Sequence, residues 1–307
     1  MATLADRLAN PTRVLSLPEL ANTFQVARIE AVMPGYGFLA NDMDMLRKLR
    51  GALGTVLVRS ASRDAQAGRP CPWQPPCALD VMFREQLRLE GRHGLPKPWV
   101  LAADRHGGDL VIIVSVFGMA IDWAPAMSAA IADALVHGVR WDAVAKGTFL
   151  PKPQIAMLRI VEQDGVRELE ANAVIQLRLR TPLDAEGKDA RDEPATILSR
   201  LARRIDMLAR WQDAIIGYHW PPPTETWLDI DYELSNLCMN NISRRANRGK
   251  NAFDQAILTG AITMRGATQD AWWLLRLAEL THVGRGGTSG FGRVATVTYS
   301  EMYVDLR

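Results

Sequence analysis

The sequence predicts an α+β fold with two small sheets, each backed by helices. Strand-like and helix-like segments alternate in both halves of the chain, yet too few βα units follow one another to build a large parallel sheet. A length of 307 residues allows two domains of ordinary size. Apolar residues make up 48% of the chain, enough to give each domain a core. We predict domains at 1–169 and 170–307.

The first half is predicted to alternate strands with helices. The segment 41–53 is a predicted helix because Asn41 or Asp42 can cap it and apolar residues follow at helical spacing. The segment 55–60 either extends this helix or forms a short strand. The strongest strand signal is the nearly continuous apolar run at 109–118. The other predicted elements here are a strand at 23–32, a helix at 123–138 and a strand with a turn at 148–165.

The second half repeats the alternation. It has strand-like text at 171–183 and a clear amphipathic helix at 194–215. The arginines of that helix, which we expect to lie off its apolar stripe, are Arg200, Arg203, Arg204 and Arg210. A strand at 256–266, a helix at 270–284 and a closing strand at 293–300 follow. Trp272 and Trp273 are adjacent on the last helix, so we expect only one of them to face the core.

Bulk composition limits the function classes. A formal net charge of +2 means that any nucleic-acid surface must be local. The N-terminal text lacks an apolar signal-peptide core, and we expect a cytoplasmic protein with reduced cysteines. Cys71 and Cys77 in "CPWQPPC" form either half of a zinc site or a proline-stiffened loop. No second cysteine pair completes a site, so we predict no metal and no cofactor.

A glycine-rich stretch, "THVGRGGTSGFGRV" at 281–294, is the most unusual text in the chain. It follows a helix and precedes a strand, the reverse of a dinucleotide-binding turn, and it lacks the Gly-Lys-Ser/Thr of a phosphate-binding loop. One interpretation is a nest of backbone N–H groups that a phosphodiester can approach closely. The other is a flexible turn between helix and strand.

A second basic stretch, "NNISRRANRGKNAF" at 240–253, carries four cations and no acid. Such a run is often only a solvated face. Two acid-free basic stretches in one half of the chain favour contacts with RNA phosphates, and the segment could form a helical projection in the groove of an RNA stem.

Several segments of the sequence, taken in order, resemble a known family. The helix, the glycine-rich loop and the final strand are similar to the C-terminal loop of the CRISPR-associated RAMP superfamily, and specifically to its precursor-crRNA-processing endoribonucleases. Further similar text, in the family's order, is LRGALGTVL (49–57), RPCPWQPP (69–76), LPKPWVL (95–101), SVFGMAIDWAPAMSAAI (115–131) and LRLRTPL (177–183). The resemblance spans roughly residues 24 to 298, and the type IV variety is one candidate.

The resemblance implies two tandem ferredoxin-like (RRM-like) domains with a C-terminal glycine-rich loop. It also implies binding of CRISPR repeat RNA and metal-independent cleavage, in which a 2′-hydroxyl attacks the adjacent phosphate and leaves a 2′,3′-cyclic phosphate. The product crRNA hairpin is expected to stay bound, and other subunits of a CRISPR effector complex are candidate partners.

Family members often carry a histidine near the first helix, but the segment 33–53 has none. The catalytic candidates are therefore Tyr36, Lys48, Arg50 and His282. The candidate RNA-binding residues are Arg28, Arg244, Arg245, Arg248, Lys250, Gly284, Arg285, Gly286, Gly287, Gly290, Gly292 and Arg293. Because arginine stays protonated at neutral pH, an arginine-rich site would act through positioning and charge. The missing histidine leaves open a non-catalytic RAMP subunit that binds crRNA and scaffolds an effector complex. A third alternative is an α+β protein whose basic loops are only surface, with no salt-sensitive affinity for RNA.

Overall fold

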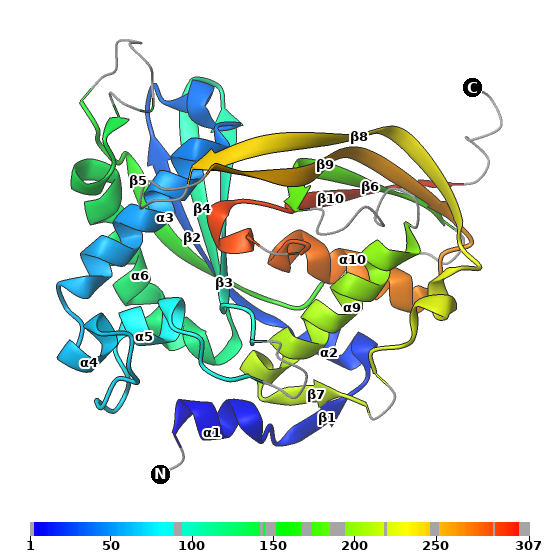
Figure 1. Ribbon diagram of the computed structural model, residues 1–307, viewed down its shortest axis with the longest axis horizontal. Helices are drawn as coiled ribbons and strands as arrows, with labels where there is room; N and C mark the ends of the chain where they lie inside the picture. Colours follow the sequence, from blue (N-terminus) through cyan, green and yellow to red (C-terminus); the bar gives the residue numbers. More distant parts are fainter. Residues whose placement is uncertain are drawn as a thin grey trace.

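The computed structural model describes residues 3–88, 94–141, 144, 152–166, 173–184, 194–217, 220–245, 252–284 and 286–300. Two four-stranded antiparallel sheets organise the chain, and a two-stranded parallel sheet joins its N-terminal segment to its second half (Figure 1).

The first sheet has the strand order β3-β4-β2-β5. Its strands are β2 (Gln25–Met33), β3 (Trp99–His106), β4 (Asp109–Phe117) and β5 (Met157–Asp164). The helix α3 (Met43–Val58) connects β2 to β3, and α6 (Ala124–Asp133) connects β4 to β5. This β-α-β-β-α-β order defines a ferredoxin-like domain. Shorter helical pieces on these connections are η1 (Gly37–Leu39), α4 (Arg63–Gln66), α5 (Ala78–Phe83), η2 (Gly118–Trp123) and η3 (Ala134–Gly138).

The second sheet repeats the arrangement with the order β10-β6-β9-β8. Its strands are β6 (Ala173–Asp184), β8 (Asp231–Arg245), β9 (Ala252–Arg265) and β10 (Val294–Ser300). The helices α9 (Ala195–Ala209) and α10 (Gln269–Thr281) occupy the two crossover positions. The predicted pair of tandem ferredoxin-like domains is therefore confirmed. The remaining elements are α1 (Leu4–Ala9), β1 (Arg13–Leu15), α2 (Leu17–Thr23), η4 (Arg210–Gln212), β7 (Ala214–Ile216), η5 (Thr224–Trp227) and η6 (Gly287–Ser289).

The helix α3 carries two of the four residues predicted for catalysis, Lys48 and Arg50. Its N-cap is Asp42, whose carboxylate accepts hydrogen bonds from the N–H groups of Asp44 (2.8 Å) and Met45 (3.0 Å). The helix runs on to Val58, so the segment 55–60 extends the helix and forms no strand. Leu46 and Leu49 are buried, which leaves the basic residues between them on the accessible side.

Most of the buried apolar side chains of both domains form one continuous core, and Ala102, Val111 and Ile113 form a small separate cluster. The stretch Gly118–Gly138 is long and apolar enough to cross a membrane, with a mean hydropathy of 1.3. Its central helix, α6, packs on β2 and β5 and buries Met127 and Ile131. These contacts make it a core helix of the first domain.

Both adjacent tryptophans of α10 are buried, at 7% exposure for Trp272 and 1% for Trp273. The expectation that only one would face the core is wrong. The reason is that α10 contacts β10 on one side and α2 and α9 on others, so more than one face of the helix is covered.

The strands β8 and β9 form a hairpin longer than the sheet to which it belongs. β8 pairs with β9 as far as Asn241↔Ala256 to Arg245↔Ala252. The described pairing of β9 with β6 ends at Ile257, so these last pairs of the hairpin extend beyond it. We call residues 241–245 and 252–256 the hairpin arm. The predicted helical projection is wrong in this part, because these residues continue a β-ladder. Residues 246–251, which include Arg248 and Lys250, lie outside the described residues.

The N-terminal segment packs against the second half of the chain. β1 pairs in parallel with β7, and Arg210 Nη1 donates to the carbonyl oxygens of Leu8 (3.0 Å) and Ala9 (3.1 Å). The domain boundary between residues 169 and 170 stays a prediction.

Candidate RNA-cleavage site

The glycine-rich loop is a compact structure that returns on itself between α10 and β10. Val283 N donates to Gly292 O (2.7 Å), and Phe291 N and Ser289 N both donate to Gly286 O. A second anchor is the hydrogen bond from Gly292 N to Pro182 O (2.9 Å) at the end of β6. These backbone bonds fix the loop in one conformation.

The glycines of this loop make room for the protein itself. A Cβ added at Gly287 would lie 2.9 Å from Val100 Cγ1 of β3, and one at Gly290 would lie 2.3 Å from Leu46 Cδ1 of α3. A Cβ at Gly292 would lie 1.9 Å from Val283 O. The loop therefore packs closely against the rest of the protein, and at these three positions the fold itself requires glycine. Contact of these glycines with RNA stays a prediction.

The other two glycines predicted to bind RNA are more accessible. Gly286 is exposed and Gly284 is half-buried. Both have a positive φ (84° and 72°), a conformation that glycine adopts without strain. Their role in RNA binding stays a prediction. Arg285, between them, lies outside the described residues.

A half-buried arginine, Arg204 of α9, holds the start of the loop through two hydrogen bonds. Its Nη2 donates to Thr281 O (2.9 Å) and its Nε to His282 O (3.2 Å), so it satisfies carbonyl groups that the end of α10 leaves without helical partners. Burial lowers its pKa to about 10, so the guanidinium stays charged at neutral pH. The amphipathic pattern of the helix predicts only that Arg204 lies off its apolar stripe. It does not predict the role of Arg204 in the loop, because hydrogen bonds to backbone carbonyl groups leave no pattern in the sequence.

Two of the predicted catalytic residues lie in the core. His282 is 3% exposed, and its Nδ1 lies 3.2 Å from Phe291 O. Burial, together with the charges of Arg293 and Arg204, lowers the pKa of His282 to about 3. The imidazole is thus neutral and shielded beneath the loop and does not lie at its mouth, and its catalytic role stays a prediction.

Tyr36 is 1% exposed, with its ring centroid 5.0 Å from that of Trp141 in an edge-on contact. Burial raises the pKa of its hydroxyl above the ordinary value. A core tyrosine of this kind stabilises the first domain through aromatic packing, and its catalytic role stays a prediction.

The other two catalytic candidates lie where α3 meets the glycine-rich loop. Arg50 Nε donates to Thr288 Oγ1 of η6 (3.1 Å), and its guanidinium lies 5.6 Å from the ring centroid of Phe83. Lys48 Nζ lies 3.2 Å from Asp44 Oδ2, one turn away on the surface of the helix. The structure therefore brings the glycine-rich loop next to Arg50 and Lys48, although more than two hundred residues separate the loop from α3 in sequence.

A pocket of about 680 Å³ opens at this junction, and we call it the basic pocket. It is lined by Asp44, Arg47, Lys48, Arg50, Gly51, Gly138, Val139, Arg140 and Ser289. Four of these residues are cations and one is an acid. Because the acid is an exposed partner of Arg47 (3.3 Å) and Lys48, its ion pairs are weak and can give way to a phosphate.

Arg140 completes the basic pocket from the end of η3. It is exposed, and within the described part of the chain it has no ion-pair partner. Sequence analysis missed it because the text after Gly138 reads as an ordinary helix end. Its position depends on how α3 packs on η3, a tertiary contact that no local pattern encodes.

Lys97 is a second residue that sequence analysis missed. It lies half-buried in the turn before β3, within electrostatic reach of Arg50. Burial lowers its pKa to about 8, close enough to neutrality for proton exchange. It does not line the basic pocket. Its one sequence signal is its place between two prolines, in "PKPW".

The remaining basic candidates occupy other places. Arg28 on β2 lies 3.3 Å from Glu30 Oε1, beyond the lining of the basic pocket. Arg293 forms two hydrogen bonds to Asp104 of β3 (2.6 and 2.8 Å) and one to Ala103 O, so it joins the two domains. These bonds hold the pKa of Asp104 below its ordinary value. The backbones of Arg244 and Arg245 lie in the hairpin arm.

Among the described residues, no three His, Cys, Asp or Glu side chains gather closely enough to hold a metal ion. Cys77 N donates to Cys71 Sγ (3.3 Å), so the two cysteines are direct neighbours.

Comparison with known proteins finds a family model that matches the second half of the chain. The sequence-family model described as CRISPR-associated endoribonuclease Cas6 matches residues 177–294. A solved Cas6 product complex is similar with a TM-score of 0.49 and 18% identity, over 89% of this chain and 99% of that one. Cas6 of Thermus thermophilus (TM-score 0.46, 15% identity) and Csf5, a CRISPR-Cas type IV Cas6 crRNA endonuclease (TM-score 0.43, 13% identity), are similar over the same shares. None of the curated proteins compared with the chain matches it. The matched residues run from β6 to the first residue of β10 and include the whole glycine-rich loop, so this part of the chain is similar to the Cas6 family of CRISPR-associated endoribonucleases.

Proposed function

We propose that this protein cleaves CRISPR repeat RNA at the basic pocket and keeps the product hairpin bound. In the proposed reaction, a 2′-hydroxyl attacks the adjacent phosphorus while the bond to the 5′-oxygen breaks, leaving a 2′,3′-cyclic phosphate and a 5′-hydroxyl without a metal ion. The observation that carries the proposal is the convergence of four cations on one pocket beside the glycine-rich loop, which lies in the part of the chain that the Cas6 family model matches.

The chemistry of such a site is electrostatic. Attack by the 2′-oxygen places extra negative charge on the oxygens around phosphorus, and fixed cations stabilise that charge more in the transition state than in the ground state. Arg50 is suited to this role because Thr288 and Phe83 hold its guanidinium in place before the substrate arrives. Arg47, Lys48 and Arg140 can bind the flanking phosphates and align the attack.

The hairpin arm supports the binding part of the proposal. Its two strands project beyond the sheet and carry Arg244 and Arg245 at the far end. In the view of Figure 1 the hairpin extends from the second sheet in the direction of α3, which lines the basic pocket. We infer that an RNA stem contacts the arm while its cleaved end reaches the pocket.

Loss of both arm cations is expected to weaken RNA binding and flatten its dependence on salt. Each phosphate contact that is lost lowers the slope of log affinity against log salt by roughly one unit. The measurement for Arg244→Ala with Arg245→Ala is a titration of repeat RNA at several salt concentrations. A matched control is Arg7→Ala with Arg63→Ala, two exposed arginines on α1 and α4, which lie in the lower part of Figure 1, below the hairpin. If the arm variant keeps the affinity and slope of the control, the arm does not bind RNA.

One observation favours a second candidate function. His282 is 3% exposed and Tyr36 is 1% exposed, so neither side chain is open to an RNA bound at the surface. A non-catalytic subunit that binds crRNA and scaffolds an effector complex would need only the cations. The two candidates differ in whether bound RNA is cut.

The experiment that separates them is single-turnover incubation with the CRISPR repeat RNA of the same genome, in EDTA and with protein in excess. The nuclease is expected to convert bound RNA to two fragments. Tight binding of RNA that stays intact would reject the nuclease and leave the scaffold.

A further inference from the structure

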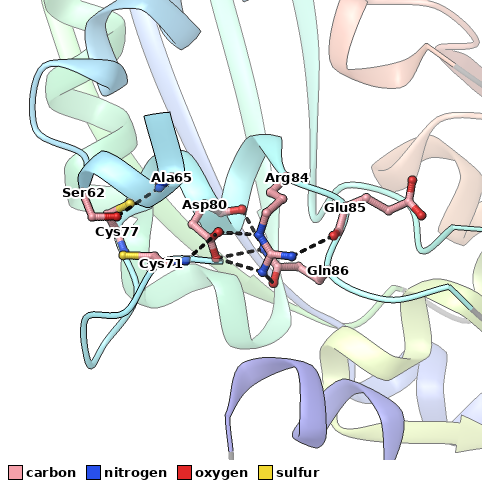
Figure 2. A network of polar contacts seen from close by, with 8 residues as sticks. All are labelled: Ser62, Ala65, Cys71, Cys77, Asp80, Arg84, Glu85 and Gln86. Atoms are coloured by element: carbon pink, nitrogen blue, oxygen red, sulfur yellow. Dashed lines mark hydrogen bonds and ion pairs between the residues drawn. The ribbon is translucent and has the colours of Figure 1, made fainter. Parts of the chain in front are cut away.

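The loop at residues 69–77 is held closed by a polar network at the start of α5 (Figure 2). Cys71 N donates to Asp80 Oδ1 (3.2 Å), and Cys77 N donates to Cys71 Sγ (3.3 Å). Asp80 is 3% exposed, and Arg84 and Gln86 occupy its remaining acceptor positions. The two cysteines are therefore brought together by the fold, without a bond between their sulfur atoms.

The two thiols differ in accessibility and in acidity. Cys71 is half-buried, whereas Cys77 is 8% exposed. Burial opposes ionisation of Cys71, but hydrogen bonds from the Ser62 hydroxyl, from the backbone amides of Cys77 and Trp73 and from the Cys77 thiol outweigh it and hold the pKa of Cys71 below its ordinary value. Burial raises the pKa of Cys77. Cys71 is thus the more acidic and the more solvent-accessible of the two thiols, and the buried Cys77 is its neighbour.

This asymmetry is the arrangement needed for thiol–disulfide exchange, in which an accessible thiolate attacks and a neighbouring thiol resolves the product. The contact between Cys77 N and Cys71 Sγ also favours the thiolate, because a backbone N–H stabilises negative charge on sulfur. A third thiol, Cys238 on β8, is exposed and separate from this loop.

We propose that Cys71 and Cys77 form a reversible dithiol–disulfide site that reacts with small disulfides such as oxidised glutathione. The Cys71 thiolate attacks one sulfur of the reagent and releases one glutathione thiolate. The Cys77 thiol then loses its proton and attacks Cys71 Sγ, which releases the second glutathione. Two protein thiols are oxidised and one reagent disulfide is reduced to two thiols, so electrons and protons balance. The site does not depend on the proposed nuclease activity.

The test uses the full chain with Cys238→Ser, which leaves two thiols. After treatment with excess oxidised glutathione, the intact mass is expected to fall by two hydrogen atoms, with both thiols lost to titration and recovered after dithiothreitol. Protein that keeps both thiols, stops as a mixed disulfide or forms a covalent dimer would overturn the proposal.

Two further variants in this background assign the order of attack. Cys77→Ser is expected to keep one glutathione on Cys71, because the resolving thiol is gone. Cys71→Ser is expected to stay unmodified, because Cys77 is shielded. Glutathione on Cys77 in the second variant, at the rate seen for Cys71, would contradict the assigned order.

Discussion

Replacement of Arg50 by alanine is expected to slow cleavage of the repeat RNA by about 10²- to 10³-fold, the loss seen when one pre-organised charge donor is removed from a transition state. Arg50 is the lining cation that the glycine-rich loop itself holds, through Thr288. Because the effect falls on the transition state, RNA affinity should change much less than the rate. The measurement is the single-turnover rate at saturating protein, with affinity determined in parallel.

Two control variants make this result interpretable. Arg50→Lys keeps a charge but not the planar guanidinium that donates to Thr288, so an intermediate rate is expected. Arg59→Ala removes an arginine from the C-cap of the same helix, where it pairs with Asp133 (2.8 Å) outside the basic pocket. It should cleave like the unaltered protein. Equal rates for Arg50→Ala and Arg59→Ala would remove Arg50 from the reaction.

The second large effect is expected at Gly292, on stability. Its φ of 68° is strained for any residue with a side chain, and an added Cβ would lie 1.9 Å from the backbone oxygen of Val283. The residue cannot move aside, because its N–H and C=O are both hydrogen-bonded, to Pro182 O and Val283 N. Gly292→Ala should therefore lower the free energy of unfolding by about 3–5 kcal/mol. Urea denaturation followed by tryptophan fluorescence measures this loss.

Gly51 provides the matched control for a glycine-to-alanine change. It lies on α3 and lines the basic pocket, and a Cβ there would meet nothing within 4 Å. Since alanine favours the helix more than glycine does, Gly51→Ala should raise stability by up to about 1 kcal/mol. If Gly292→Ala unfolds at the same urea concentration as Gly51→Ala, the loop is not packed in the way described.

Much of the fold could be predicted because the periodicity of the chain agrees with it. The helix α9 follows its apolar stripe, and α3 follows its cap and its buried leucines. β3 and the long strand β8 were missed. β3 follows proline-rich text, and β8 contains a bulge between Ser235 and Cys238 that interrupts its alternation. Its polar, basic end also lacks the apolar pattern by which strands are recognised.

The site could be predicted only in part, for a physical reason. The sequence identifies charged residues such as Lys48 and Arg50, and it identifies a loop that needs glycine. It does not reveal which side chains the fold buries. His282 has the right chemistry but lies under the loop at 3% exposure, whereas Arg204 stabilises that loop through carbonyl groups that carry no sequence signal.

The central claim is that the 2′-hydroxyl of the RNA is the nucleophile at a pocket that supplies charge. The most direct measurement compares the repeat RNA with the same RNA carrying one 2′-deoxy nucleotide immediately before the scissile phosphate, both in EDTA. We expect the first to be cut, with a 2′,3′-cyclic phosphate on the upstream fragment, and the second to bind equally well and stay intact. Cleavage of the deoxy substrate at the same site, or cleavage that requires a divalent metal, would contradict the mechanism.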